Sequence, residues 1–148
     1  MSGHDYSKHL RLFMTKINIE QLIQAAAQAR QLAVAPYSNF LVGAALLTRT
    51  GEIITGANVE SASYGLTCCA ERVALFKALT DGKNDFVAVA VVAKAPDGAT
   101  PCGACRQLLA EYAPNAGVFV ADSRALKKIH RYTVAKLLPR AFTGDALG

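Results

Sequence analysis

The first regular pattern of hydrophobic positions runs from Ile19 to Val34, where apolar residues recur at helical spacing among Gln, Glu and Arg side chains. Asn18 can cap the amino end of this segment, and Pro36 ends it. The segment is therefore predicted to be a helix. The alanine residues on its apolar face would allow another element to approach closely.

Two later segments also have helical spacing. Cys69–Thr80 carries apolar residues at helical intervals and ends near Gly82. Gly103–Tyr112 is predicted to be a shorter helix, which is closed by Pro114. A last turn of helix is expected before Pro139.

Five segments are predicted to be strands. Phe40–Thr48 and Glu52–Asn58 are rich in apolar and β-branched residues and are separated by a short polar turn, which indicates a hairpin. Phe86–Ala93 is almost continuously apolar, as is typical of a strand buried on both faces, and we expect it at the centre of the sheet. Gly117–Ala121 is a second buried strand, and Ile129–Thr133 is expected to be the last. Helices that alternate with such strands predict an α/β layer fold, with helices on both faces of a sheet.

The composition fits one globular domain. Of the 148 residues, 52% are hydrophobic and 18% are charged, and a chain of this length can bury a core. We expect residues 19–148 to form this domain and residues 1–18 to be an extension without a targeting signal. The longest apolar run, Phe86–Ala93, is too short to span a bilayer, so no membrane contact and a cytoplasmic location are expected. A mean hydropathy of +0.22 is high for so small a domain and indicates contacts between subunits.

The formal net charge of +5 raises the question of an acidic partner such as nucleic acid. Most basic residues are spread singly, and only Arg124, Lys127, Lys128 and Arg131 form a cluster. Tyr132 is the one aromatic residue beside that cluster. The pattern therefore favours a solvated face, and no nucleic-acid partner is expected.

The cysteine residues carry the strongest chemical signal. Cys102 and Cys105 have the spacing that allows two sulfur atoms to bind one metal ion, although this pair alone is weak evidence. Cys69, with Glu71 two residues further on, strengthens the signal, because three ligands leave the fourth tetrahedral position of zinc open for water. The Glu71 carboxylate would then lie beside that water, which is a catalytic arrangement. A structural zinc would need a fourth protein ligand, and folding could bring His130 close.

The surroundings of the cysteines leave two points open. Both motifs fall at predicted helix starts, where free N–H groups and the helix dipole favour thiolates. Arg72 could donate to a ligand sulfur and offset the charge of three thiolates, or it could be an ordinary surface cation. Cys68 is expected to be a small buried hydrophobe, because the spacing to the glutamate selects Cys69 as the ligand.

Four ordered motifs carry a resemblance to a known family. They are SNFLVGAAL at 38–46, GANVESASYG at 56–65, CAER at 69–72 and PCGACRQ at 101–107. The last two resemble the signature of the zinc nucleobase deaminases, and the set resembles the small cytidine deaminases from about residue 19 to residue 142. The resemblance implies a three-layer α/β/α sandwich with a mixed central sheet of about five strands. It also implies one Zn²⁺ per subunit and a homotetramer whose active sites are completed across subunits.

The resemblance implies roles for residues that match the family motifs. Glu71 would move protons, and Arg72 would donate to the ligand sulfurs. Tyr37 is a further possible contact. The implied zinc ligands are Cys69, Cys102 and Cys105, and the implied substrate contacts are Phe40, Asn58, Glu60, Ala62, Tyr64, Ala70 and Phe142.

The implied reaction is the hydrolytic deamination of cytidine, and of 2′-deoxycytidine, to uridine or deoxyuridine and ammonia in pyrimidine salvage. Zinc-activated water would attack C4 of the ring, and Glu71 would carry protons to N3 and to the leaving amine. One alternative is a relative that deaminates a blasticidin-type antibiotic, against which Glu60 argues, because a carboxylate can accept from a ribose hydroxyl. Another alternative is a structural zinc protein that grips nucleic acid through residues 124–131.

Overall fold

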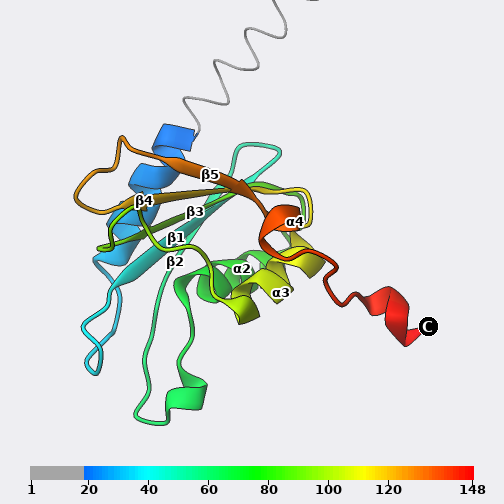
Figure 1. Ribbon diagram of the computed structural model, residues 1–148, viewed down its shortest axis with the longest axis horizontal. Helices are drawn as coiled ribbons and strands as arrows, with labels where there is room; N and C mark the ends of the chain where they lie inside the picture. The colour runs from blue at the N-terminus through cyan, green and yellow to red at the C-terminus, as the bar shows by residue number, and fades with distance from the viewer. Residues whose placement is uncertain (1–18) are drawn as a thin grey trace, which may run out of the picture.

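The computed structural model of the chain describes residues 19–148. The expected extension, residues 1–18, and the expected cap Asn18 lie outside these residues. The described part forms a single sheet with helices packed against it (Figure 1). Within residues 19–148, no helix has both the length and the apolar character needed to cross a membrane.

The sheet contains five strands in the order β2-β1-β3-β4-β5. β1 pairs antiparallel with β2 and with β3, β3 pairs parallel with β4, and β4 pairs antiparallel with β5. The prediction of a mixed sheet with Phe86–Ala93 at its centre is therefore confirmed. The strands are β1 (Val42–Thr48), β2 (Ile53–Ala57), β3 (Phe86–Ala93), β4 (Gly117–Asp122) and β5 (His130–Thr133).

Helices cover both faces of the sheet, as the three-layer prediction requires. One face packs against the helix of residues 19–30, which is blue in Figure 1. The other face packs against α2 (Ala70–Thr80), α3 (Gly103–Tyr112) and α4 (Val134–Leu137). The 3-10 helices are η1 (Tyr64–Leu66) and η2 (Gly144–Leu147).

The central strand β3 divides its side chains between two hydrophobic cores, because successive residues of a strand point to opposite faces. Val89 and Val91 lie in the core under α2 and α3. Ala88, Ala90 and Val92 lie in the core under the first helix. The near-continuous apolar run thus follows from burial on both faces.

Two glycines bring the helices close to the sheet. A Cβ atom added at Gly43 would lie 1.9 Å from the backbone oxygen of Ala26, and one added at Gly56 would lie 2.5 Å from the backbone nitrogen of Ala74. Neither distance is possible for a real side chain, so only glycine fits. At Gly43 this is the close approach that the alanine-rich helix face predicted, and at Gly56 it sets α2 directly on the strand.

Two predicted boundaries differ from the structure by more than one residue. The first helix ends at residue 30 rather than at Val34, because Val34 leaves it to form a bridge with the segment after β2. Its N–H donates to the carbonyl of Asn58 at 2.9 Å, and its carbonyl accepts from the N–H of Glu60 at 2.8 Å. Strand β1 begins at Val42 rather than at Phe40, since the chain turns at Asn39, which has a φ of 56°.

Candidate active site

Three cysteines from two helix starts converge at one point. Cys69 is the N-cap of α2, Cys102 is the N-cap of α3, and Cys105 lies in the first turn of α3. The sulfur of Cys102 lies 3.7 Å from that of Cys69 and 3.5 Å from that of Cys105. All three Sγ atoms lie within 4.8 Å of one another.

This arrangement fits a zinc ion. Zinc–sulfur bonds of about 2.3 Å in a tetrahedron place two sulfur atoms about 3.8 Å apart, close to the distances between these sulfurs. Among the described residues, no histidine or carboxylate joins the three cysteines in the cluster. His130 instead lies beside Asp97, with Nε2 3.4 Å from the carboxylate. Three protein ligands leave a fourth position for water or substrate, which is typical of a catalytic zinc site.

The environment of Cys69 favours its thiolate. Hydrogen bonds from Cys105 and from Arg72 lower the pKa of Cys69 to about 5, although burial acts in the opposite direction. Arg72 donates from Nη2 to Cys69 Sγ at 3.5 Å and to the carbonyl of Thr67 at 3.2 Å. The sequence left two interpretations open for Arg72, and the structure shows the one in which it donates to the sulfur of an expected zinc ligand, Cys69.

Glu71 is buried although it carries a carboxyl group. Only 5% of its surface is exposed, and it lies in the first turn of α2, two residues after Cys69. Burial raises the pKa of Glu71, and the Cys69 thiolate raises it further. A buried carboxyl group beside a cluster of metal ligands is well placed to exchange protons with a molecule bound there.

A cavity of about 260 Å³ opens in front of these residues. Phe40, Asn58, Glu60 and Ala70, four of the expected substrate contacts, lie in its wall together with Glu71. The walls also contain residues that sequence reasoning missed, because small and apolar side chains carry no chemical signal of their own. These are Ser38, Val42, Thr67, Val91, Ala99 and Thr100.

The sequence profile described as "Cytidine and deoxycytidylate deaminase zinc-binding region" matches residues 16–121. A cytidine deaminase of Halalkalibacterium halodurans is 52% identical over 127 residues, which cover 85% of this chain and 95% of that protein. The chain belongs to this deaminase family.

Solved structures agree with this assignment. The crystal structure of cytidine deaminase from Burkholderia pseudomallei is 47% identical, with a TM-score of 0.79 over 82% of this chain and 97% of that one. Another relative by sequence, a blasticidin-S deaminase of Bacillus cereus, is 34% identical, and the match covers 69% of this chain and 76% of that protein. The protein is thus a deaminase hydrolase of the zinc type, and its fold is that of the cytidine deaminases.

Two polar residues in the cavity wall of this deaminase are held by the segment that leads into β1. The side chain of Asn58 accepts from the N–H of Val42 and donates to the carbonyl of Phe40, both at 2.8 Å. One oxygen of Glu60 accepts from the N–H groups of Tyr37 and Ser38, both at 3.1 Å. The side chain of Ser38, together with these two backbone groups, lowers the pKa of the Glu60 carboxyl group. Its second oxygen makes none of the hydrogen bonds found among the described residues.

Other expected contacts lie outside the cavity wall in this deaminase chain. Tyr64, in η1, is 78% exposed and meets Tyr37 edge-on with ring centroids 6.3 Å apart. Ala62 is also exposed. Phe142 is 60% exposed, and its carbonyl accepts from Gln107 at 2.9 Å. The substrate roles of Ala62, Tyr64 and Phe142 therefore stay predictions.

Cys68 lies outside the cysteine cluster of the deaminase. Its backbone pairs with Val59, with N–H···O distances of 2.9 and 3.0 Å. Burial raises the pKa of the Cys68 thiol. The expectation that Cys68 is buried is wrong, because the residue is only partly buried. That Cys69, rather than Cys68, is the ligand stays a prediction.

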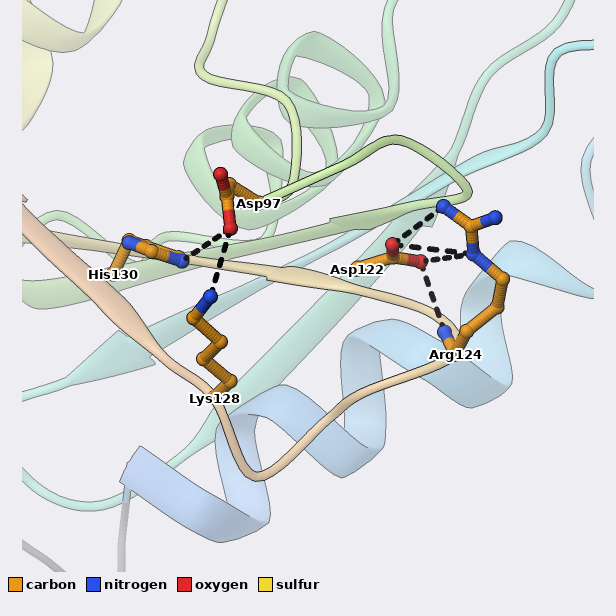
Figure 2. Close-up of polar contacts among 5 residues, drawn as sticks. All are labelled: Asp97, Asp122, Arg124, Lys128 and His130. Carbon is orange, nitrogen blue, oxygen red and sulfur yellow. Dashed lines mark hydrogen bonds and ion pairs between the residues drawn. The ribbon is translucent and has the colours of Figure 1, made fainter.

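A second group of charged residues includes none of the residues of the cavity wall (Figure 2). Asp97 contacts Lys128 at 3.1 Å as well as His130, and Asp122 binds Arg124 through its side chain, with a shortest distance of 2.7 Å. Two of the four clustered basic residues, Arg124 and Lys128, are therefore paired with carboxylates. A third, Arg131, packs over the ring of Phe119 at 5.4 Å from its centroid.

Proposed function

We propose that this deaminase hydrolyses cytidine, and also 2′-deoxycytidine, to the corresponding uracil nucleoside and ammonia. The proposal is carried by one observation: the buried carboxyl group of Glu71 shares a cavity of about 260 Å³ with two of the clustered cysteines, Cys69 and Cys102, and with the partly exposed Glu60. Such a cavity offers proton transfer at one end and hydrogen bonding for sugar hydroxyls at the other. The relatives with the higher identities named above are cytidine deaminases.

Cys69, Cys102 and Cys105 would hold one zinc ion per subunit. The ion supplies a Lewis acid that lowers the pKa of water towards about 7, which makes hydroxide available at neutral pH. Arg72 would keep Cys69 oriented and offset part of the thiolate charge through its hydrogen bond to Sγ.

Glu71 would act as both base and acid. Its carboxylate accepts a proton from the water that attacks C4 and delivers that proton to N3 of the ring. It next takes the proton of the new C4 hydroxyl group and passes it to the amino group, which leaves as ammonia while the C4 carbonyl forms. Both protons come from the water, so the carboxylate returns to its starting state.

Phe40, Asn58 and Glu60 would determine recognition of the nucleoside. Glu60 keeps one oxygen free to accept from a ribose hydroxyl, while its other oxygen fixes the loop at Tyr37 and Ser38. The Asn58 amide retains one N–H and one acceptor position beyond its two backbone bonds. The Phe40 ring is 42% exposed at the cavity and offers a face to the base.

The chain would work as a homotetramer in the cytoplasm, in pyrimidine salvage. Leu32, Val34, Tyr37, Tyr64 and Leu66 are large, exposed, and lie in the two loops beside the cavity. Apolar surface of this kind supports a subunit interface, and Tyr64 and Phe142 would then complete sites across it. Four free cysteines fit a reducing compartment. Residues 19–148 would act as one catalytic domain.

Two rival functions receive less support. An antibiotic deaminase would have no use for a carboxylate at the sugar end of the cavity, where Glu60 lies. A nucleic-acid grip would need free cations, but Arg124 and Lys128 already pair with carboxylates (Figure 2). We therefore prefer the nucleoside as substrate.

The test is the ultraviolet absorbance of cytidine and deoxycytidine mixed with the purified protein, beside Glu71→Gln. Glutamine keeps the shape of the side chain but cannot carry a proton, so we expect the variant to retain zinc and to lose at least about a hundredfold in kcat. A zinc-loaded wild type that leaves both nucleosides unchanged would overturn the proposal. A Glu71→Gln variant with full activity would overturn the role of the glutamate.

A further inference from the structure

Arg106 joins the loop that enters α3 to the end of another helix. Its Nε donates to the carbonyl of Pro101 at 2.7 Å, and its Nη2 donates to the hydroxyl oxygen of Thr100 at 3.0 Å. Its Nη1 reaches the carbonyl of Leu137, the last residue of α4, at 2.9 Å. All three acceptors are neutral oxygen atoms, and none of the ion pairs within residues 19–148 includes Arg106.

Two of these acceptors lie at the cavity. Thr100 is part of its wall, and Pro101 directly precedes Cys102, one of the clustered cysteines. Arg106 itself lies one turn after Cys102, and its backbone N–H donates to the Cys102 carbonyl at 2.9 Å. The side chain of Arg106 thus holds the two residues directly before Cys102, and its backbone N–H holds the carbonyl of Cys102 itself.

The third acceptor connects this turn to the carboxyl-terminal segment. Leu137 ends α4, which packs against α3 (Figure 1), and the chain then runs on to Phe142. Gln107, the neighbour of Arg106, donates to the Phe142 carbonyl at 2.9 Å. Two consecutive side chains of α3 therefore hold the segment that carries Phe142.

We propose that Arg106 is a positioning residue of the deaminase site: it fixes the Thr100–Pro101 turn before Cys102 and couples this turn to the carboxyl-terminal segment. The inference rests on the proposed function, because it concerns the same cavity. The planar guanidinium matches the geometry, since its donors reach three acceptors at once. A lysine has one nitrogen at the end of a flexible stem and cannot span these acceptors.

The first test compares Arg106→Lys with Arg124→Lys, which makes the same chemical change in an ion pair (Figure 2) whose two residues are not part of the cavity wall. Both variants are loaded with zinc, and its release to a coloured chelator is followed well below the unfolding temperature, together with KM and kcat for cytidine. Loss of a group that orients a metal ligand costs about 10- to 100-fold in metal affinity. We expect zinc to be released at least about ten times faster from Arg106→Lys than from wild type. Arg124→Lys should release zinc at the wild-type rate.

The second test uses Thr100→Val and Thr100→Ser. Valine keeps the shape of threonine and removes the acceptor of Arg106, whereas serine keeps the hydroxyl group. Thr100→Val should raise KM and speed zinc release, and Thr100→Ser should restore both to wild-type values. A folded Arg106→Lys with zinc release and kinetic constants within twofold of wild type would overturn the proposal, as would equal behaviour of the two Thr100 variants. If the wild type fails to deaminate cytidine, the proposed function fails, while the zinc-release comparison still tests Arg106.

Discussion

Substitution of Asn58 measures how much two hydrogen bonds to the backbone at the cavity contribute to stability and to substrate binding. Its side chain is 8% exposed and makes two hydrogen bonds of 2.8 Å, to the N–H of Val42 and to the carbonyl of Phe40. Asn58→Ala leaves both backbone groups without their partner. An unsatisfied buried group costs about 1–3 kcal/mol, and the lower value applies here because Phe40 and Val42 are only partly buried.

Two lost hydrogen bonds at about 1 kcal/mol each predict that Asn58→Ala lowers the free energy of unfolding by about 2 kcal/mol. For a chain of this size, that is a fall in Tm of about 4–8 °C. Asn58→Asp has the shape of asparagine but places a carboxylate oxygen against the Phe40 carbonyl, and it should lose at least as much stability at neutral pH. Because Phe40 lines the cavity, KM should rise in both variants.

The assay is urea unfolding at one fixed protein concentration, since the proposed subunit association would make stability concentration-dependent. Asn84→Ala is the matched control, because Asn84 is exposed and its side chain makes none of the hydrogen bonds found in residues 19–148. An Asn58→Asp variant as stable as wild type would refute the reasoning. It would mean that side-chain volume, and not the hydrogen bond to Phe40, matters at this position.

Three further predictions concern the packing of the first helix, the metal site and the carboxylate of Asp122. Gly43→Ala should lower the free energy of unfolding in urea by about 3 kcal/mol or more, because the first helix must move away from the sheet. Gly65→Ala, where the space around the added methyl group is open, should keep a free energy of unfolding near that of wild type. Cys69→Ala should abolish zinc binding and activity, whereas Cys68→Ala should keep both; metal analysis that gave the reverse would show that the ligand is misassigned. Hydrogen bonds from the neighbouring arginine lower the pKa of Asp122 to about 2. The stabilising effect of that carboxylate is therefore complete above the ordinary Asp pKa of about 3.9 and is lost only as the pH falls through about 2. An NMR titration of Asp122 with a midpoint near the ordinary value would contradict this.

Local sequence determined most of the elements and predicted which residues would bind a metal ion. Hydrophobic periodicity places α3 at its observed bounds and Phe86–Ala93 at the centre of the sheet, because a strand covered on both faces must be apolar at almost every position. The spacing of Cys69, Cys102, Cys105 and Glu71 indicates a zinc site, because a metal ion restricts which side chains can surround it.

Tertiary structure decided what depends on contacts between distant segments. Val34 leaves the first helix because it pairs with residues after β2. The spacing of apolar residues within the helix cannot reveal a pairing partner that is distant in the sequence. Arg72 donates a hydrogen bond to the Cys69 sulfur because the chain folds Thr67 and Cys69 around its guanidinium. Thr100 and Ser38 become cavity walls only when two loops meet. The spacing of hydrophobic residues indicates which face of a helix or strand is buried, whereas hydrogen bonds between loops depend on the complete fold.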